Sequence, residues 1–140
     1  MKEVYVAFSK YNKKTNEIIC NYLTENSIEN LLYKQESYYP SIIDSILHVL
    51  ESDRKWFSRL TIVNNKNYLE GINTEFLDSL TKEKLLTDKK ILLAIIKIRK
   101  EIDDQLMKFV ASIDEVQFSQ EFEIQFGKGK IDKKLWQILM

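Results

Sequence analysis

The stretch 41-SIIDSILHVLESDRKWFSRL-60 decides the fold class of this chain of 140 residues. Its apolar residues recur at intervals of three and four, which places them on one side of an α-helix. They are Ile42, Ile43, Ile46, Leu47, Leu50, Phe57 and Leu60. Pro40 precedes them, and proline suits the first turn of a helix because its missing N–H would have no partner there. The stretch therefore predicts a long amphipathic helix from about Pro40 to Ile62.

Two residues of this helix are notable when its residues are placed around the axis at about 100° each. His48 lies roughly 155° from the mean apolar direction, on the polar side, where a solvated histidine is the simplest interpretation. Asp53 lies within about 20° of the mean apolar direction. A buried carboxylate needs hydrogen-bond partners, so Asp53 is expected to be a structural polar residue.

A second amphipathic helix is predicted at the start of the chain, from about Lys2 to Leu23. Its apolar face combines the residues Val4, Phe8, Tyr11, Thr15, Ile18, Ile19 and Tyr22. This face, with Asn12 at its edge, offers candidate partners for Asp53. We expect Asp53 to bond Tyr11, Asn12 or Thr15 and to fix the register of the two helices.

The second half of the chain predicts a third long helix, beginning near Thr87, and then a change of period. The apolar stripe of this helix consists of Ile91, Leu92, Ile95, Ile96, Ile102, Leu106, Phe109, Val110 and Ile113. Apolar residues then fall at even spacing at positions 116, 118, 122, 124 and 126, which indicates a short extended, β-like segment. A last helix is expected to begin at Ile131 and to reach Met140 after about two turns.

The amino-acid composition restricts the fold class, the kinds of partner and the cellular compartment. Three glycines and one proline leave few sites for tight turns, which favours an all-α fold in a single domain over residues 1–140. The 21 basic and 21 acidic residues balance, so neither nucleic acid nor a membrane surface is an expected partner. Cys20 is the only cysteine, and no apolar run has the length of a signal peptide or a membrane span, which together favour a cytoplasmic protein.

Three motifs resemble the DinB-like family of metal-binding four-helix bundles. The first is the spacing of His48, Asp53, Trp56 and Leu60. The others are Tyr11-Asn12-Lys13-Lys14-Thr15-Asn16, which resembles that family's Tyr-Asn-x-x-x-Asn opening, and Gly127 with 135-LWQILM-140, which resembles the entry to its last helix. The resemblance implies an up-down four-helix bundle with a long crossover between the second and third helices.

The resemblance also implies a metal site. Members of the family often hold a divalent metal, zinc or nickel, with three histidines, and His48 matches the first of them. The other two belong to a His-x-x-x-His stretch that would begin beyond Met140. We therefore expect the last helix to be truncated and no metal to be tightly held by these residues. The apolar stripes left uncovered would then favour a homodimer.

Two functions of different classes follow. The resemblance implies a metal-dependent enzyme of the thiol S-transferase or hydrolase type, acting on a small thiol or another small molecule. In such an enzyme the metal would lower the pKa of a bound thiol or water. The alternative is a non-catalytic helical bundle that binds a small ligand or a protein partner, since one histidine does not complete the metal site.

Overall fold

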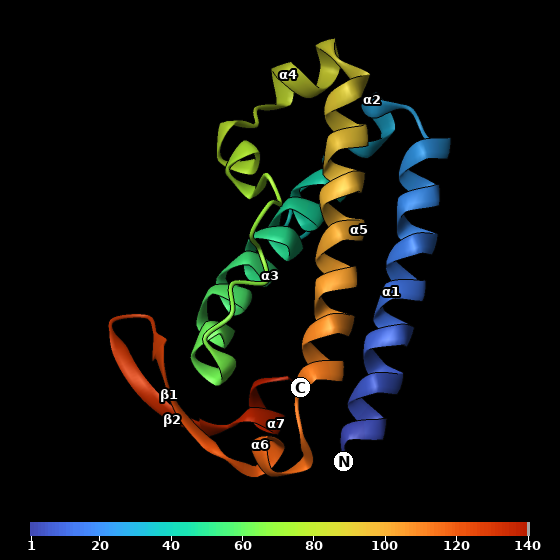
Figure 1. Cartoon of the computed structure of the whole chain (residues 1–140). Coiled ribbons are helices and arrows are strands. Elements are labelled where there is room, and N and C mark those ends of the chain that lie inside the picture. The colour runs from blue at the N-terminus through green and yellow to red at the C-terminus, as the bar shows by residue number, and fades with distance from the viewer. Residues whose placement is uncertain (140) are drawn as a thin grey trace.

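Three long helices form the body of the computed structural model, which describes residues 1–139 apart from the side chains of Lys82 and Thr87. They are α1 (Lys2–Glu25), α3 (Ile42–Asn64) and α5 (Lys89–Ser112). Helix α1 runs antiparallel to α5, whereas α3 runs in the same direction as α5 (Figure 1). The chain therefore has to return along the molecule between α3 and α5.

The return path is the segment 65–88, which contains the 3₁₀-helix η1 (Thr74–Ser79) and α4 (Lys82–Thr87). It is tied to α3 by a bidentate ion pair, in which both terminal nitrogens of Arg54 donate to Asp78 at 2.9 Å. Another short helix, α2 (Ile28–Leu31), lies in the connection between α1 and α3. Helix α5 begins after its N-cap, Asp88, whose side chain accepts from the backbone of Lys90, so it starts slightly later than expected.

The C-terminal part contains α6 (Glu115–Ser119), β1 (Glu121–Phe126), β2 (Gly129–Lys134) and α7 (Leu135–Ile138). The extended segment is confirmed for β1. Its expected beginning is wrong, because a capping box between Asp114 and Gln117 starts α6 instead. The expected helix start at Ile131 is also wrong, because Ile131 pairs with Ile124 in the antiparallel hairpin. The described part of the last helix is the four-residue α7, and Met140 lies outside the described residues.

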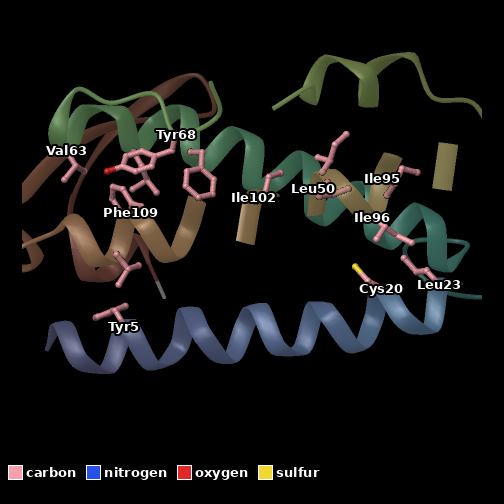
Figure 2. Close-up of a cluster of buried hydrophobic side chains, with 14 of the residues drawn as sticks. Tyr5, Cys20, Leu23, Leu50, Val63, Tyr68, Ile95, Ile96, Ile102 and Phe109 are labelled. Carbon is pink, nitrogen blue, oxygen red and sulfur yellow. The ribbon is translucent and has the colours of Figure 1, made fainter. Parts of the chain in front are cut away.

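The core lies between α3 and α5 and reaches both ends of α1, at Tyr5 and at Cys20 and Leu23 (Figure 2). Helix α5 contributes more of it than any other element, with Leu92, Ile95, Ile96, Ile98, Ile102, Phe109 and Val110 all buried. Helix α3 contributes Ile43, Leu50, Phe57, Leu60 and Val63. The predicted apolar stripes of these two helices are therefore confirmed, and the molecule is mostly helical with one small sheet before the last helix.

Helix α1 differs from the prediction in the face that it buries. Its buried residues are Tyr5, Ser9, Cys20 and Leu23, with Asn12 and Asn16 partly buried between them. The predicted apolar face lies largely in solvent, and Tyr11 is 73% exposed. Tyr5 anchors the buried face, because its ring stacks on Phe118 at 5.1 Å and its hydroxyl donates to the Trp136 carbonyl. The physical reason for the choice of face lies in a charged cluster on α5.

Candidate functional site

Arg99 is the centre of a charged cluster inside the molecule. It lies in the middle of α5 and is only 5% exposed. One terminal nitrogen donates to Asp53 on α3, and the other donates to Asp103 Oδ1, one turn further along α5, at 2.7 Å. Its Nε atom is buried and has no hydrogen-bond partner among the described residues. A buried guanidinium needs such partners, so the cluster constrains how the three long helices pack.

Helix α1 completes the cluster with two amide side chains. Asn16 Nδ2 donates to Asp103 Oδ1 at 2.8 Å, and Asn12 Nδ2 donates to the same oxygen at 3.1 Å. Asp103 is 2% exposed. Burial raises the pKa of its carboxyl, while Arg99 and the hydrogen bond from Asn16 oppose the rise. Without the two asparagines, the buried Asp103 carboxylate would accept a hydrogen bond only from Arg99.

The expected partners of Asp53 have to be corrected. Asp53 accepts from Arg99 on α5, whereas Asn12 bonds Asp103. Tyr11 projects into solvent and is therefore not a partner of Asp53. The Asp53 side chain is 33% exposed, so it is less buried than its place on the helix suggested. Asp53 is still a structural polar residue that joins two helices, but these helices are α3 and α5.

The cluster lies in the floor of a groove between α1 and α3. Three hollows follow one face of α5, from Ile95 to Val110. A further hollow, of about 750 Å³, lies elsewhere, and the three in the groove measure about 560, 150 and 50 Å³. Arg99 lines the two smaller hollows, and Leu106 and Leu139 line the two larger ones of the groove. We call this continuous feature the α1–α3 groove.

The walls of the groove are mostly apolar. Helix α1 contributes Tyr5, Phe8, Tyr11 and Thr15 at one end and Ile19, Cys20 and Leu23 at the other. Helix α3 contributes Ile46, Val49, Trp56, Phe57 and Leu60. Cys20 is buried in this wall, and burial raises the pKa of its thiol. A neutral thiol packs as a small apolar side chain, so Cys20 here belongs to the wall rather than to a nucleophilic site.

The hollow of about 750 Å³ lies between α3 and the crossover segment. Its cationic side chain is that of Arg54, which forms ion pairs with Glu51 at 2.8 Å and with Asp78 at 2.9 Å. These two carboxylates hold the pKa of Arg54 above its usual value. The other residues that line this hollow are mostly polar, among them Ser58, Thr61, Asn67 and Asn73, so it lacks the apolar walls that the groove offers to a partner.

His48 is exposed on α3 and is not among the residues that line the hollows of the groove. Its ring stacks on Tyr39 at 4.4 Å, and its Nε2 lies 3.4 Å from the Ser52 hydroxyl. Across the described residues, no three or more His, Cys, Asp or Glu side chains are grouped closely enough to hold a metal ion. The surroundings of His48 therefore do not fit a metal centre built from the described residues.

Comparisons with protein-family models, with curated proteins and with solved structures give no match to this chain. Its function is therefore inferred from the geometry of the groove and of the charged cluster. None of the helices in the described part of the chain combines the length and the apolar character that a membrane crossing requires.

Arg99 and Asp103 are the site residues that sequence reasoning missed. They lie four residues apart inside the apolar stripe of α5, on the side that carries Ile95, Ile102 and Leu106. The helical-wheel calculation that singled out Asp53, applied to α5, places Arg99 about 30° from the mean apolar direction and Asp103 about 65° from it, at the edge of the stripe. An arginine on one apolar face and an aspartate on another then point to a buried ion pair between two helices.

Proposed function

We propose that this protein is a non-catalytic helical interaction module whose α1–α3 groove binds an amphipathic helix. The observation that carries the proposal is the groove itself, an apolar channel along α5 that holds one buried charged cluster. Large open apolar surfaces with a few fixed polar groups are characteristic of binding sites for partners.

The dimensions of the groove support a helix as the bound element. It follows α5 from Ile95 to Val110, which is roughly 22 Å at 1.5 Å per residue. Its walls are two long helices, so the space between them has the form that a third helical cylinder fills. Helices bind such grooves by inserting side chains spaced three and four residues apart.

The charged cluster indicates that the bound helix should carry one polar residue within its apolar stripe. Arg99 Nε is buried and lacks an acceptor among the described residues, while Arg99 lines two of the hollows. A hydroxyl or amide oxygen in the middle of the bound helix's apolar stripe can accept from it. An uninterrupted apolar stripe would leave this donor without an acceptor, as it is in the unbound protein.

The test is a binding titration with a defined probe. The probe is a fluorescein-labelled amphipathic peptide of three heptads, with leucine in its stripe, one central serine, and alanine and glutamine elsewhere. We expect its anisotropy to rise with protein concentration and to saturate. Leu106→Lys, in the groove, should weaken binding by about tenfold or more, equivalent to 1.4 kcal/mol.

Leu93→Lys is the matched control for this titration. Leu93 lies on the same helix, is 55% exposed and receives the same substitution outside the groove. Its variant should bind the peptide as the unmodified protein does. The proposal is wrong if the two variants bind equally well, or if the unmodified protein does not bind at concentrations up to about 100 μM, the range of weak non-covalent complexes.

A DinB-like, metal-dependent enzyme is the second candidate. The observation that favours it is the order of α1, α3 and α5 with a long connection between α3 and α5, which agrees with the helix order that the sequence resemblance implies. His48 would then be a zinc or nickel ligand. Calorimetric titration with Ni²⁺ tests this, because His48→Ala should abolish binding while Ser52→Ala should not.

A further inference from the structure

Helix α1 displays an exposed stripe with the spacing of a coiled-coil seam. We define the α1 stripe as Val4, Phe8, Tyr11, Thr15, Ile18 and Tyr22. Its five larger residues are between 49% and 73% exposed. The intervals between consecutive members are four, three, four, three and four residues, the pattern that keeps side chains facing a partner helix.

We infer that the α1 stripe pairs with the α1 stripe of a second copy, antiparallel and across a two-fold axis. The inference extends the proposed function, because α1 of the second copy then lies beside the groove and covers one end of it, while the two hollows that Arg99 lines stay open to the partner helix. Phe8, Tyr11 and Thr15 belong to the stripe and also line the 560 Å³ hollow. A helix laid along the stripe therefore covers this end of the groove as well.

The sizes of the stripe residues determine the register. Three are aromatic and three are β-branched. An antiparallel pair centred at the level of residue 13 places Val4 opposite Tyr22, Phe8 opposite Ile18 and Tyr11 opposite Thr15 of the second copy. Each aromatic ring then meets a smaller, β-branched side chain. Alternation of large and small residues across an interface lets the two surfaces interdigitate without voids.

The parallel arrangement lacks this complementarity. It would place each aromatic ring opposite its own copy and Thr15 opposite Thr15. The flanking charges favour the antiparallel register too, since Lys10 of one copy comes near the level of Glu17 of the other, whereas in the parallel register Lys10 meets Lys10. Thr15, the polar member, lies near the centre of the pair. This is also the level of Asn12 and Asn16, which bond the charged cluster.

The α1 stripe supplies more than half of the area that a stable dimer needs. With about 200 Å² for a fully exposed aromatic side chain, the exposed fractions give roughly 500 Å² of apolar surface. A stable interface buries about 800 Å² per partner, and the adjoining hollow of the groove supplies further contact area. A monomer that left this surface in water would expose an apolar patch near the upper end of what soluble proteins tolerate.

Sedimentation equilibrium of the full chain tests the inference. We expect a dimer at tens of micromolar, the range expected for an interface of modest size. Ile18→Lys introduces two charges into the seam and should give a monomer, while circular dichroism shows an unchanged helix content. Leu93→Lys, an equally exposed apolar residue on α5, should leave the dimer intact. A monomeric unmodified protein, or dissociation by both substitutions alike, would overturn the inference.

Disulfide trapping tests the direction of the two helices. In a Cys20→Ala background, a Phe8→Cys copy mixed with an Ile18→Cys copy should form a mixed covalent dimer on oxidation, because the antiparallel register brings the two positions together. Phe8→Cys alone should remain largely monomeric on a denaturing gel. Efficient self-linkage of Phe8→Cys with no mixed product would indicate a parallel pair and contradict the proposed register.

Failure of this inference and failure of the proposed function give different results. If the unmodified protein is monomeric but binds the labelled peptide, and Leu106→Lys abolishes that binding, the groove function stands and the second copy is not its occupant. If Ile18→Lys gives a monomer, the end of its groove is uncovered, and it should bind the labelled peptide at least as tightly as the unmodified protein does. If this monomer binds the peptide as weakly as Leu106→Lys does, the groove function fails.

Discussion

Two faces of α1 lie in environments opposite to those that their composition suggests. One face carries Ser9, Asn12 and Asn16 and packs on α5, whereas the next carries Phe8, Tyr11 and Ile18 and lies in water. The faces are separated by about a third of a turn of the helix. Hydrophobicity alone would have turned the second face inward, so another contribution decides the orientation of α1.

That contribution is the buried charge on α5. Rotating α1 to bury its apolar stripe would remove Asn12 and Asn16 from the Asp103 carboxyl, which is 2% exposed. A buried carboxylate that loses its donors costs several kcal/mol, about as much as burying two large apolar side chains contributes. The apolar stripe also remains available to a partner, whereas the Asp103 carboxyl depends on donors from within its own chain.

The largest effect is expected from Arg99→Ala, which removes the centre of the cluster. It leaves Asp103 buried and Asp53 without its cation, and breaking such a pair from one side costs about 3–5 kcal/mol. Urea unfolding followed by circular dichroism measures the loss. Lys100→Ala, an exposed neighbour on the same helix, is the control and should change stability by less than about 0.5 kcal/mol. A similar loss in both variants would mean that the cluster does not hold the helices together.

The next effect is expected from the asparagines. Asn16→Ala removes the shorter hydrogen bond to Asp103 and should cost about 1–3 kcal/mol, while Asn12→Ala removes the longer one and should cost less. Alanine favours the helix and offsets part of each loss. The control is Thr15→Ala in the α1 stripe, expected to be nearly neutral in the monomer. If Thr15→Ala were the most destabilising of the three, the exposed face would be the one that stabilises the fold.

The outcome for α1 shows what the periodicity in the sequence predicts and what it does not. A spacing of three and four residues identified all three long helices and the buried stripes of α3 and α5, because each of those helices has one dominant apolar face. Helix α1 has two adjacent faces with acceptable spacing. The choice between them depends on Arg99 and Asp103, some ninety positions away, which the pattern of α1 does not contain.

The C-terminal part was predicted less well for a different reason. Even spacing identified β1, but β2 reads GKIDKK and has no apolar alternation of its own. It forms because Gly127, at φ 59°, turns the chain back and Ile131 reaches Ile124 across the hairpin. The groove was predictable only as an uncovered apolar surface, because its lining comes from three helices whose relative positions depend on the buried cluster.

A smaller effect is expected at Asp53, which lies at the exposed end of the cluster. Its side chain is 33% exposed, so solvent replaces part of its interaction with Arg99. Asp53→Ala should cost about 1 kcal/mol, and Asp53→Asn should cost less, because the shape and an acceptor survive. Chemical denaturation of both variants provides the comparison. An unchanged midpoint for Asp53→Ala would show that Asp103 alone satisfies Arg99.

The smallest effect concerns pH and again distinguishes the buried face of α1 from the exposed one. Burial raises the pKa of the Asp103 carboxyl above the ordinary value of about 3.9. Between that value and the raised one, the folded state binds more protons than the unfolded state, so the free energy of unfolding increases as pH falls through this window. The Asp103→Asn variant has no carboxyl group to protonate at this position. The difference in the free energy of unfolding between the unmodified protein and this variant should therefore increase as the pH is lowered. Urea unfolding of the unmodified protein and of this variant, at several pH values from about 7 down to 3.5, measures the difference. A difference that shrinks toward acid would mean that the donors from Arg99, Asn12 and Asn16 outweigh burial and hold the carboxylate ionised.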